Sequence, residues 1–173
     1  MDDLRYPIGP FDFEQPVTMD TVRVAIDEIA ACPAALRNAV RGFDDAKLDT
    51  PYRDGGWTVR QVVHHLPDSH MNAFVRIKLG LTEDNPTIKP YEQQLWAELA
   101  DARGPIGPSL AILDALHERW APLLRSLEEK DYRRTIFHPE YGSMSLGLLT
   151  AHYAWHGKHH VAHITSLRKR MGW

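Results

Sequence analysis

The sequence predicts an all-α protein, an antiparallel four-helix bundle with short extra helices between the long ones. Four long stretches carry apolar residues at the spacing of amphipathic helices, and clusters of proline and glycine separate these stretches. The composition agrees, because 43% hydrophobic and 25% charged residues in a chain of 173 are typical of a globular protein with a sizeable core. We therefore expect a single domain over residues 1–173.

The first long helix is predicted to follow an extended N-terminal arm. Residues 1–17 contain three prolines and no sustained period, which favours an extended segment. Thr18 is a suitable N-cap, and apolar residues follow it at helical spacing until Gly42. Pro33 interrupts this pattern, so we expect either one broken helix or two consecutive ones.

The second long helix has the strongest start signal in the chain. The sequence Thr58-Val59-Arg60-Gln61 fits a capping box, in which the threonine hydroxyl and the glutamine side chain each satisfy a free backbone amide. The apolar period then continues toward Gly80. Pro67 lies inside this helix and predicts a kink, because proline removes one backbone hydrogen bond.

The third long helix is predicted over residues 110–127, with Pro122 inside it. Residues 82–90 contain two prolines and predict a loop, and residues 91–100 predict a short helix. A second cluster of glycine and proline, at 104–108, separates this short helix from the long one.

The fourth long helix carries the C-terminal part of the chain. It is expected to begin near Ser143 or Ser145 and to end near Arg170, with Gly172 stopping it. Basic residues fall in its last turn, where they complement the helix dipole. The preceding stretch, 134–144, suits a small hairpin or a loop equally well.

The composition excludes several classes of protein. A single cysteine, Cys32, cannot form an intramolecular disulfide, which argues against a disulfide-stapled secreted scaffold. The first residues are acidic and polar, and no apolar stretch approaches the length of a membrane span, so we expect a cytoplasmic protein without a membrane partner. A net charge of −3 argues against a nucleic-acid partner.

The ten histidines are the most unusual feature of the composition, and they are clustered. Five of them fall within residues 152–163, and three more fall within residues 64–70. At about 100° of rotation per residue, the five histidines of the last helix fit on an arc of about 100°. Leu149 and Leu167 lie on the same stripe, so the arc faces the core, where imidazoles are costly unless each finds a partner.

Histidines one helical turn apart can converge on one metal ion. A pair such as His156 and His160 needs a third ligand, and His65 on the other histidine-bearing helix is the natural candidate, because bundles build metal sites from facing helices. The alternative explanation is that the histidines are half-buried and hydrogen-bonded, or line a solvated groove. Spacing alone leaves three pairs open: His152 with His156, His156 with His160, and His159 with His163.

Two segments of the sequence resemble the YfiT family of the DinB-like superfamily. They are residues 52–66, YRDGGWTVRQVVHHL, and residues 155–164, WHGKHHVAHI. Residues 6–9 and 170–173 agree as well, so the resemblance covers essentially the whole chain. It implies a four-helix bundle, a homodimer and one divalent metal ion per chain. Carried over position by position, the implied metal ligands are His65, His156 and His160.

One position departs from the family pattern. The family usually has a small residue such as alanine where this chain has Pro67, and this position follows the implied ligand His65 by two residues. Proline at this position can change the course of the helix just after the ligand, but it does not change which residue is the ligand.

The resemblance implies which residues bind the metal ion, but it leaves more than one reaction open. Members of the family are described as metal-dependent hydrolases, and relatives in the superfamily are S-transferases that use a low-molecular-weight thiol such as bacillithiol. Three neutral imidazoles leave an open position on the ion, which is typical of a catalytic site, and zinc is expected before nickel. A small electrophilic substrate would be attacked by water in a hydrolase or by a thiol in an S-transferase. A metal-binding or sensing protein without catalysis is the third hypothesis.

Other polar side chains are candidates for orienting the ligands. Gln61 lies one turn before His65, although its part in the capping box is the stronger interpretation. Asp68 suits a hydrogen bond to a histidine or a solvent-facing position equally well. His117 begins an H-E-x-x-H pattern that fails at Ala121, so this protease motif is absent. The candidates are Gln61, His64, Asp68, His159 and His163.

Overall fold

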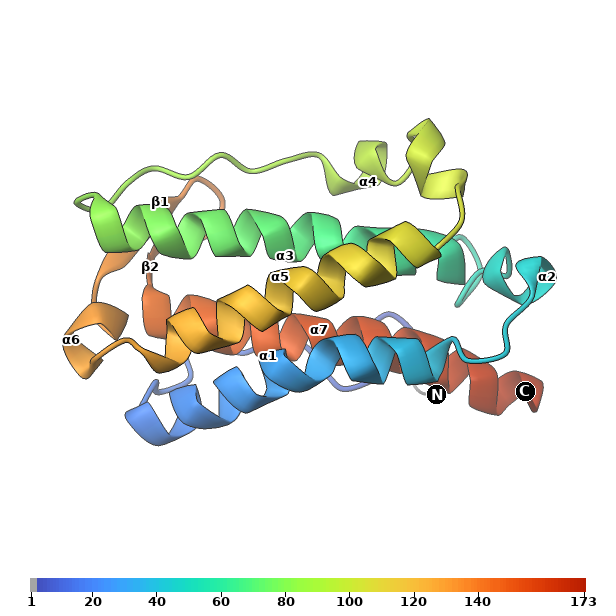
Figure 1. Ribbon diagram of the computed structural model, residues 1–173, viewed down its shortest axis with the longest axis horizontal. Coiled ribbons are helices and arrows are strands. Elements are labelled where there is room, and N and C mark those ends of the chain that lie inside the picture. The colour runs from blue at the N-terminus through green and yellow to red at the C-terminus, as the bar shows by residue number, and fades with distance from the viewer. Residues whose placement is uncertain (1–2) are drawn as a thin grey trace.

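The computed structural model describes residues 3–173, and four long helices form a bundle (Figure 1). They are α1 (Met19–Ala39), α3 (Val59–Thr82), α5 (Gly107–Arg125) and α7 (Leu146–Met171). Helices α1 and α3 each pack against both α5 and α7. The predicted four-helix bundle is confirmed.

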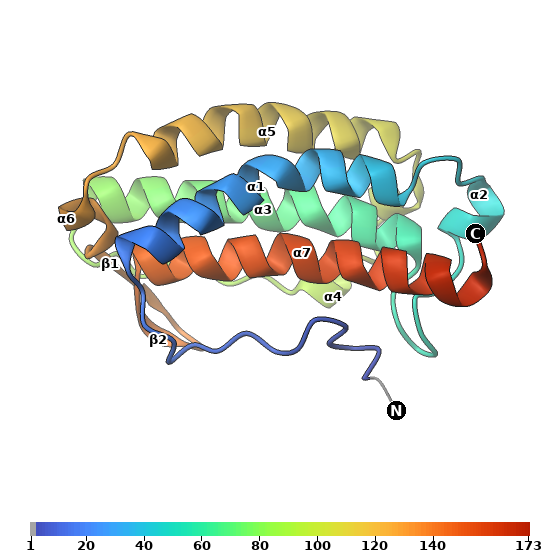
Figure 2. The ribbon, with the colours of Figure 1, turned by 90° about the horizontal axis from the view of Figure 1, so that it is seen from below.

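The direction of the helices follows from one long connection. Helices α1 and α7 run one way along the bundle, and α3 and α5 run the opposite way (Figures 1 and 2). Successive helices α3 and α5 are parallel because residues 83–106 return along the length of α3 before α5 begins. The packed pairs α1–α5 and α3–α7 are antiparallel, whereas the packed pairs α1–α7 and α3–α5 are parallel.

The predicted starts of α1, α3 and α7 are confirmed by their caps, whereas α5 begins at Gly107, before the predicted residue 110, and has no side-chain cap. The side chain of Thr18 accepts a hydrogen bond from the amide of Thr21 at the start of α1, and Ser145 does the same for Leu148 at the start of α7. The capping box of α3 is present with Thr58 as the N-cap. At the other end of α7, Gly172 adopts the left-handed conformation that closes a helix, with a φ of 68°.

Prolines inside the long helices do not divide them. Helix α1 continues through Pro33, so the expected break is wrong, and α3 likewise continues through Pro67. A proline removes one amide donor from the helix, but packing on both sides can hold the backbone in place. Ile29 and Leu36, one turn before and after Pro33, are both fully buried.

Short elements connect the long helices. Of the two alternatives for residues 134–144, a hairpin or a loop, the structure shows the hairpin, with Thr135 opposite Ser145 in an antiparallel pair. The helix predicted over residues 91–100 is shorter and is followed by a separate 3₁₀ turn. These elements are α2 (Asp45–Leu48), α4 (Gln93–Trp96), the 3₁₀ helix η1 (Ala100–Arg103), α6 (Glu129–Tyr132), β1 (Thr135–His138) and β2 (Gly142–Ser145).

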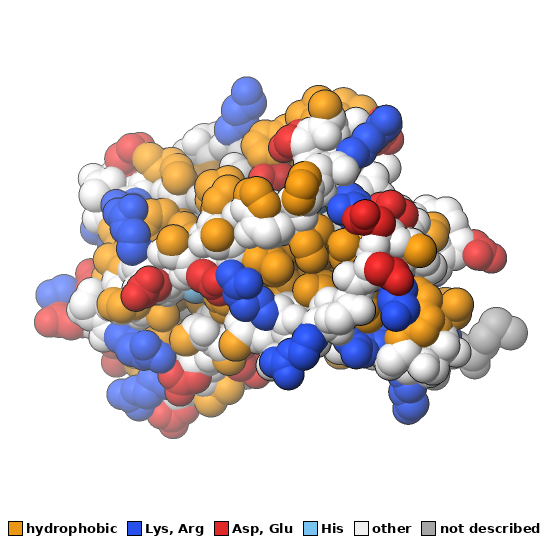
Figure 3. Space-filling view, turned by 45° about the vertical axis from the view of Figure 1, so that its right-hand side comes forward, with side chains coloured by type: hydrophobic (Ala, Val, Ile, Leu, Met, Phe, Trp, Pro, Cys, Tyr) orange, Lys and Arg blue, Asp and Glu red, His pale blue; other side chains and the backbone are white. Residues whose placement is uncertain are grey.

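The apolar core is divided into two clusters, with buried histidines between them along the bundle. On α7, residues 146–154 contribute to one cluster and residues 164–167 to the other. On α5, His117 lies between Leu113 of the second cluster and Trp120 of the first. Almost no histidine surface is visible on the face drawn in Figure 3. The fold therefore places a layer of imidazoles near the middle of the bundle.

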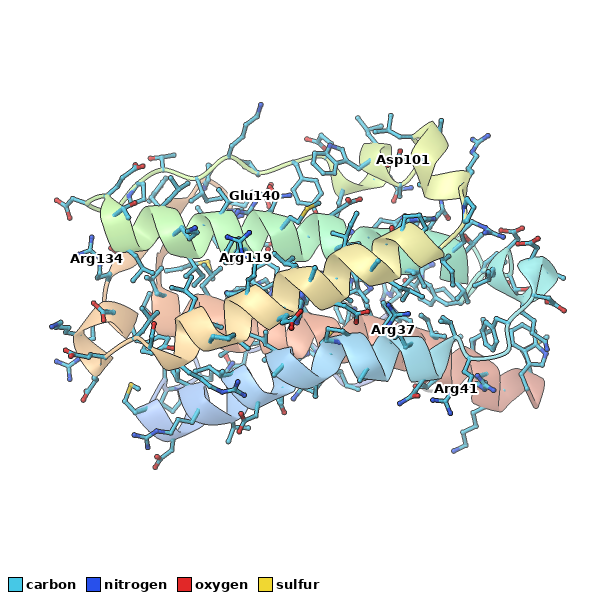
Figure 4. All side chains as sticks on the ribbon, in the orientation of Figure 1. Arg37, Arg41, Asp101, Arg119, Arg134 and Glu140 are labelled. Atoms are coloured by element: carbon cyan, nitrogen blue, oxygen red, sulfur yellow. The ribbon has the colours of Figure 1, made fainter. Side chains whose placement is uncertain are left out.

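Charged side chains tie the helices together near the surface (Figure 4). Arg37 of α1 forms an ion pair with Asp114 of α5. Arg134, just before β1, donates to the carbonyl oxygens of Gly80 at 2.6 Å and Glu83 at 2.9 Å, which satisfies the C-terminal end of α3. The first contact links α1 to α5, and the second holds the C-terminal end of α3.

The N-terminal arm lies along α7 (Figure 2). The indole of Trp155 donates to the carbonyl of Gly9 at 3.2 Å, and the rings of Phe11 and Phe13 pack against the ring of His152. The expected extended arm thus has a fixed place on the outer side of this helix. Within residues 3–173, no helix combines the length and the apolar character that a membrane span requires.

Candidate metal centre

Three histidines from two helices meet near the middle of the bundle. His65 extends from α3, and His156 and His160 extend from α7 one turn apart. One nitrogen from each ring lies within 4.8 Å of the other two. The Nε2 atoms of His65 and His156 are 3.2 Å apart. The structure therefore brings together the three residues that the family resemblance implies as ligands.

The spacing of these nitrogens fits one tetrahedral ion. Imidazole nitrogen binds zinc at about 2.0–2.1 Å, which places two ligands of a tetrahedron about 3.3 Å apart. The 3.2 Å between the Nε2 atoms of His65 and His156 is close to this value. The donor set is also chemically suitable, because imidazole is a ligand for both zinc and nickel.

Burial keeps the three imidazoles neutral. Burial, with smaller effects from neighbouring histidines, lowers the pKa of His65 to about 3. The same causes hold the pKa of His156 and that of His160 well below the usual value for histidine. Neutral imidazole is the form that binds a metal, so the site is in its ligating state at neutral pH.

Trp57 and the segment after α3 cover one side of the three histidines. The ring of Trp57 lies 4.7 Å from that of His65 and is stacked 6.2 Å from that of His160, centroid to centroid. Its indole nitrogen donates to Oε1 of Gln94 at 2.9 Å. His156 is half-buried, whereas His65 and His160 are buried.

Both polar atoms of the Gln61 side chain form hydrogen bonds with groups other than the three histidines. Its Oε1 accepts from the amide of Thr58 at 2.9 Å, as the capping box predicts. Its Nε2 donates to the carbonyl of Ala97 at 2.8 Å. Gln61 therefore fastens the segment around α4 to the start of α3, one turn before His65.

His64 and Asp68 lie on α3 but have their own surroundings. His64 contacts the hydroxyl of Ser109 through Nδ1 at 2.7 Å and the carbonyl of Gly104 through Nε2 at 3.1 Å, so it faces α5. Burial, with a smaller effect from Asp101, raises the pKa of the Asp68 carboxyl to about 6. Of these two candidates, His64 is held away from the three histidines by its hydrogen bonds.

His159 and His163 face the N-terminal arm. His163 donates from Nε2 to the carbonyl of Arg5 at 3.0 Å, and its ring is stacked on that of Tyr52. The ring of His159 is stacked on Trp155, with a centroid distance of 4.4 Å. Among the described residues, the clusters with metal-ligand geometry include neither member of this pair.

Two further histidines belong to the same layer, and the sequence interpretation gave them no role at the site. Nε2 of His70, on α3, lies 3.2 Å from Nδ1 of His156. Nδ1 of the same ring lies 2.8 Å from Nε2 of His117. His117 lies on the apolar stripe of α5, between Leu113 and Trp120. A histidine on such a stripe indicates a buried polar contact, and this signal was available in the sequence.

A surface cavity of about 860 Å³ lies beside the start of α3. Arg60, Asp45, Asp49 and Arg103 are among its lining residues, and none of the three clustered histidines is. Arg60 already donates to Asp49 at 2.6 Å and to Asp45 at 2.7 Å. The cavity is therefore separate from the histidine cluster, and its arginine is already paired.

A family model described as the DinB superfamily matches residues 28–164, which contain all three clustered histidines. The chain belongs to the DinB superfamily. Among its relatives are two proteins named "putative metal-dependent hydrolase" that match over the full length of both chains. One, from Bacillus cereus strain B4264, is 56% identical over 173 residues. The other, from Bacillus thuringiensis subsp. konkukian strain 97-27, is 55% identical over the same length.

Two solved structures agree with the bundle. The structure of YfiT from Bacillus subtilis, described as "a probable metal-dependent hydrolase with an unusual four-helix bundle topology", is 46% identical. It matches with a TM-score of 0.95 over 99% of each chain. A second four-helix bundle protein, TT2238, is 22% identical and shares the fold, with a TM-score of 0.54 over 81% of this chain and 94% of its own. The predicted resemblance to the YfiT family is confirmed.

Proposed function

We propose that this DinB-superfamily protein is a metal-dependent hydrolase in which His65, His156 and His160 hold one divalent ion. The observation that carries the proposal is the convergence of three neutral imidazoles, with a nitrogen of each within 4.8 Å of the others. The names of the relatives support the reaction class. Zinc is the first expected ion and nickel the second, because both accept imidazole ligands.

A bound divalent ion would supply Lewis acidity and would lower the pKa of water at its open position to near 7. His65, His156 and His160 carry no charge of their own when neutral, so they leave the full charge of the ion available. Three protein ligands also leave a position for water and substrate, as in other catalytic zinc sites.

The surrounding residues select how a substrate approaches. Trp57 excludes water beside His65 and His160, which strengthens electrostatic interactions there. Close to His156, the buried hydroxyl of Ser69 lies 3.5 Å from Nε2 of that ring and can bind a polar group of the substrate. We therefore expect a small electrophile, such as an ester or an amide, to bind beside His156 and Ser69.

Metal analysis of purified variants tests the ligand set. Wild-type protein should contain one ion per chain, and His160→Ala should lose it. His152→Ala is the matched control, because His152 lies on α7 two turns earlier and packs against the N-terminal arm. It should retain one ion per chain. An unchanged metal content in His160→Ala would overturn the assignment.

Activity assays with and without a chelator test the reaction. Chelator-sensitive hydrolysis of ester or amide substrates by the wild type, absent in His160→Ala, is the expected result. A parallel arm with a low-molecular-weight thiol and an alkylating electrophile distinguishes S-transfer. Product in the thiol arm alone would contradict hydrolysis and favour a thiol S-transferase. A bound ion without turnover in either arm would favour a metal-binding or sensing protein.

A further inference from the structure

A line of three hydrogen bonds runs from the candidate ligand His156 into the core. Nδ1 of His156 is 3.2 Å from Nε2 of His70, and Nδ1 of His70 is 2.8 Å from Nε2 of His117. Nδ1 of His117 is in turn 2.6 Å from the carbonyl oxygen of Ile29 in α1. The line therefore crosses from α7 through α3 and α5 to α1.

The carbonyl oxygen of Ile29 can accept the last of these hydrogen bonds because Pro33 follows it by four residues. In a regular helix the amide of residue 33 would donate to the carbonyl of residue 29. Proline has no amide hydrogen, so this carbonyl lacks its usual donor. A buried carbonyl without a partner is costly, and the His117 side chain supplies the missing hydrogen bond.

The carbonyl decides the tautomer of every ring in the line. A carbonyl oxygen can only accept, so Nδ1 of His117 carries a hydrogen. Burial lowers the pKa of His117 to about 4, so the ring is neutral and its Nε2 can only accept. Nδ1 of His70 must then donate, and its Nε2 must accept from Nδ1 of His156. The Nε2 atom of His156, which faces His65, is left with a free lone pair.

We propose that His70 and His117 are positioning residues that hold His156 with its hydrogen on Nδ1 and its Nε2 turned to the metal ion. A metal-binding histidine needs a partner for its other nitrogen, which fixes both tautomer and orientation. Here that partner is another histidine, itself fixed by a third histidine and a carbonyl. The inference rests on the proposed function only for the role of His156 as a ligand.

Cys32 offers a competing explanation of the same cluster. A potential ligand atom from each of Cys32, His70 and His117 lies within 4.8 Å of the other two, which is the geometry of a second metal site. However, the facing nitrogens of the two histidines are already within hydrogen-bond distance of each other. Burial raises the pKa of the Cys32 thiol to about 12, which keeps it neutral, whereas the thiolate is the form that binds metals.

The first test is nitrogen-15 NMR of metal-free wild-type protein labelled on histidine. Two-bond correlations to the ring protons distinguish protonated from unprotonated ring nitrogens. At neutral pH we expect the hydrogen on Nδ1 in His117, His70 and His156. A hydrogen on Nε2 in any of these three rings would overturn the proposal. The result does not depend on whether the protein is a hydrolase, so the two proposals fail separately.

The second test compares His70→Gln with His70→Asn. A glutamine amide reaches the position of Nε2 and can accept from Nδ1 of His156, whereas an asparagine amide reaches only the position of Nδ1. Zinc affinity, measured by competition with a chromogenic chelator, should fall by about 10–100-fold in His70→Asn and by less than about threefold in His70→Gln. Equal losses in both variants, or wild-type affinity in His70→Asn, would overturn the proposal.

Two controls accompany this comparison. Thermal melting of the metal-free variants tests whether both are folded. If His70→Asn does not fold, the NMR measurement on the wild type still decides whether the three rings have the proposed tautomers. Metal analysis covers the competing explanation: one ion per chain in both wild type and Cys32→Ser is the expected result. Two ions in the wild type and one in Cys32→Ser would overturn the proposal, because His70 and His117 would then be ligands.

Discussion

At the scale of single residues, Gly157 shows how closely α7 and α1 approach beside the histidine layer. A Cβ atom at this position would lie 2.8 Å from Sγ of Cys32 and 3.5 Å from Cε1 of His70. The first distance is shorter than real carbon atoms tolerate, and both neighbours are buried. The glycine thus lets Cys32 and His70 fill the space between the helices.

Gly157→Ala should therefore destabilise the protein by about 1–3 kcal/mol, because overpacking a core forces its neighbours to move. In a Cys32→Ala background the sulfur is gone, and the same substitution should be neutral or stabilise by up to about 1 kcal/mol through the helix propensity of alanine. Urea unfolding of the four proteins in this double-mutant cycle measures the coupling. Equal effects in both backgrounds would mean that the sulfur is not the obstacle.

Asp68 is a second residue whose surroundings have a measurable consequence. Burial raises the pKa of its carboxyl from 3.8 to about 6 in the folded protein. The folded protein therefore binds this proton more tightly than the unfolded chain, so the contribution of this one carboxyl to the free energy of unfolding falls as the pH rises from about 4 to 6. The charged carboxylate is a cost above that range.

Asp68→Asn removes this charge and should stabilise the protein at pH above about 7 by about 1–2 kcal/mol, after allowance for the solvent that reaches this half-buried group. Below about pH 4 both side chains are neutral, and the two proteins should unfold at similar urea concentrations. Urea midpoints at the two pH values measure the difference. A stabilisation of the same size at both would contradict an effect of charge.

At the scale of elements, local signals in the sequence predicted the starts of α1, α3 and α7 correctly. The capping box at Thr58 and Gln61 depends only on residues three apart, so no tertiary contact can override it easily. The effect of Pro33 could not be predicted in the same way, because packing around Ile29 and Leu36 holds α1 in one piece. The parallel course of α3 and α5 depends on residues 83–106, whose path carries no periodic signal.

The capping box itself provides a test at this scale. Thr58→Ala removes the hydroxyl that accepts from the amide of Gln61 at 3.2 Å, and it should cost about 1 kcal/mol of stability. Thr58→Ser keeps the hydroxyl and is the matched control, with an expected loss of only a few tenths of a kcal/mol. Urea unfolding distinguishes the two. If both variants lost the same stability, the methyl group rather than the cap would be responsible.

At the scale of the whole molecule, the histidine layer explains which part of the site was predictable. Periodicity indicated that the histidines of α7 face the core, but it left three pairs open. The facing helices suggested His65 as the third ligand, but only the family resemblance chose His156 with His160 among the three pairs, because that choice depends on how α3 and α7 face each other. His70 and His117 were missed for the same reason. The homodimer, the cytoplasmic location and the single domain over residues 1–173 stay predictions.

The same layer makes the metal-free protein sensitive to mild acid. Burial is the main cause that lowers the pKa of His117, His152 and His159 to about 4 each, from the usual histidine value of 6.5. Between about pH 6.5 and 4 the unfolded chain therefore binds more protons than the folded protein, so the free energy of unfolding falls as the pH falls. Each such histidine contributes a slope of up to about 1.4 kcal/mol per pH unit.

We therefore expect the urea midpoint of chelator-treated protein to drop steeply from about pH 7 to pH 5 and to change little between about pH 7 and 8. His152→Gln removes one of the titrating groups and should make the pH dependence shallower by about one proton. Restoring saturating zinc should raise the midpoint at pH 7, because an ion that binds only the folded state stabilises it by about 2.7 kcal/mol at a hundred times its Kd. A midpoint that stayed constant down to pH 5 would mean that these imidazoles titrate in the folded protein as they do in water.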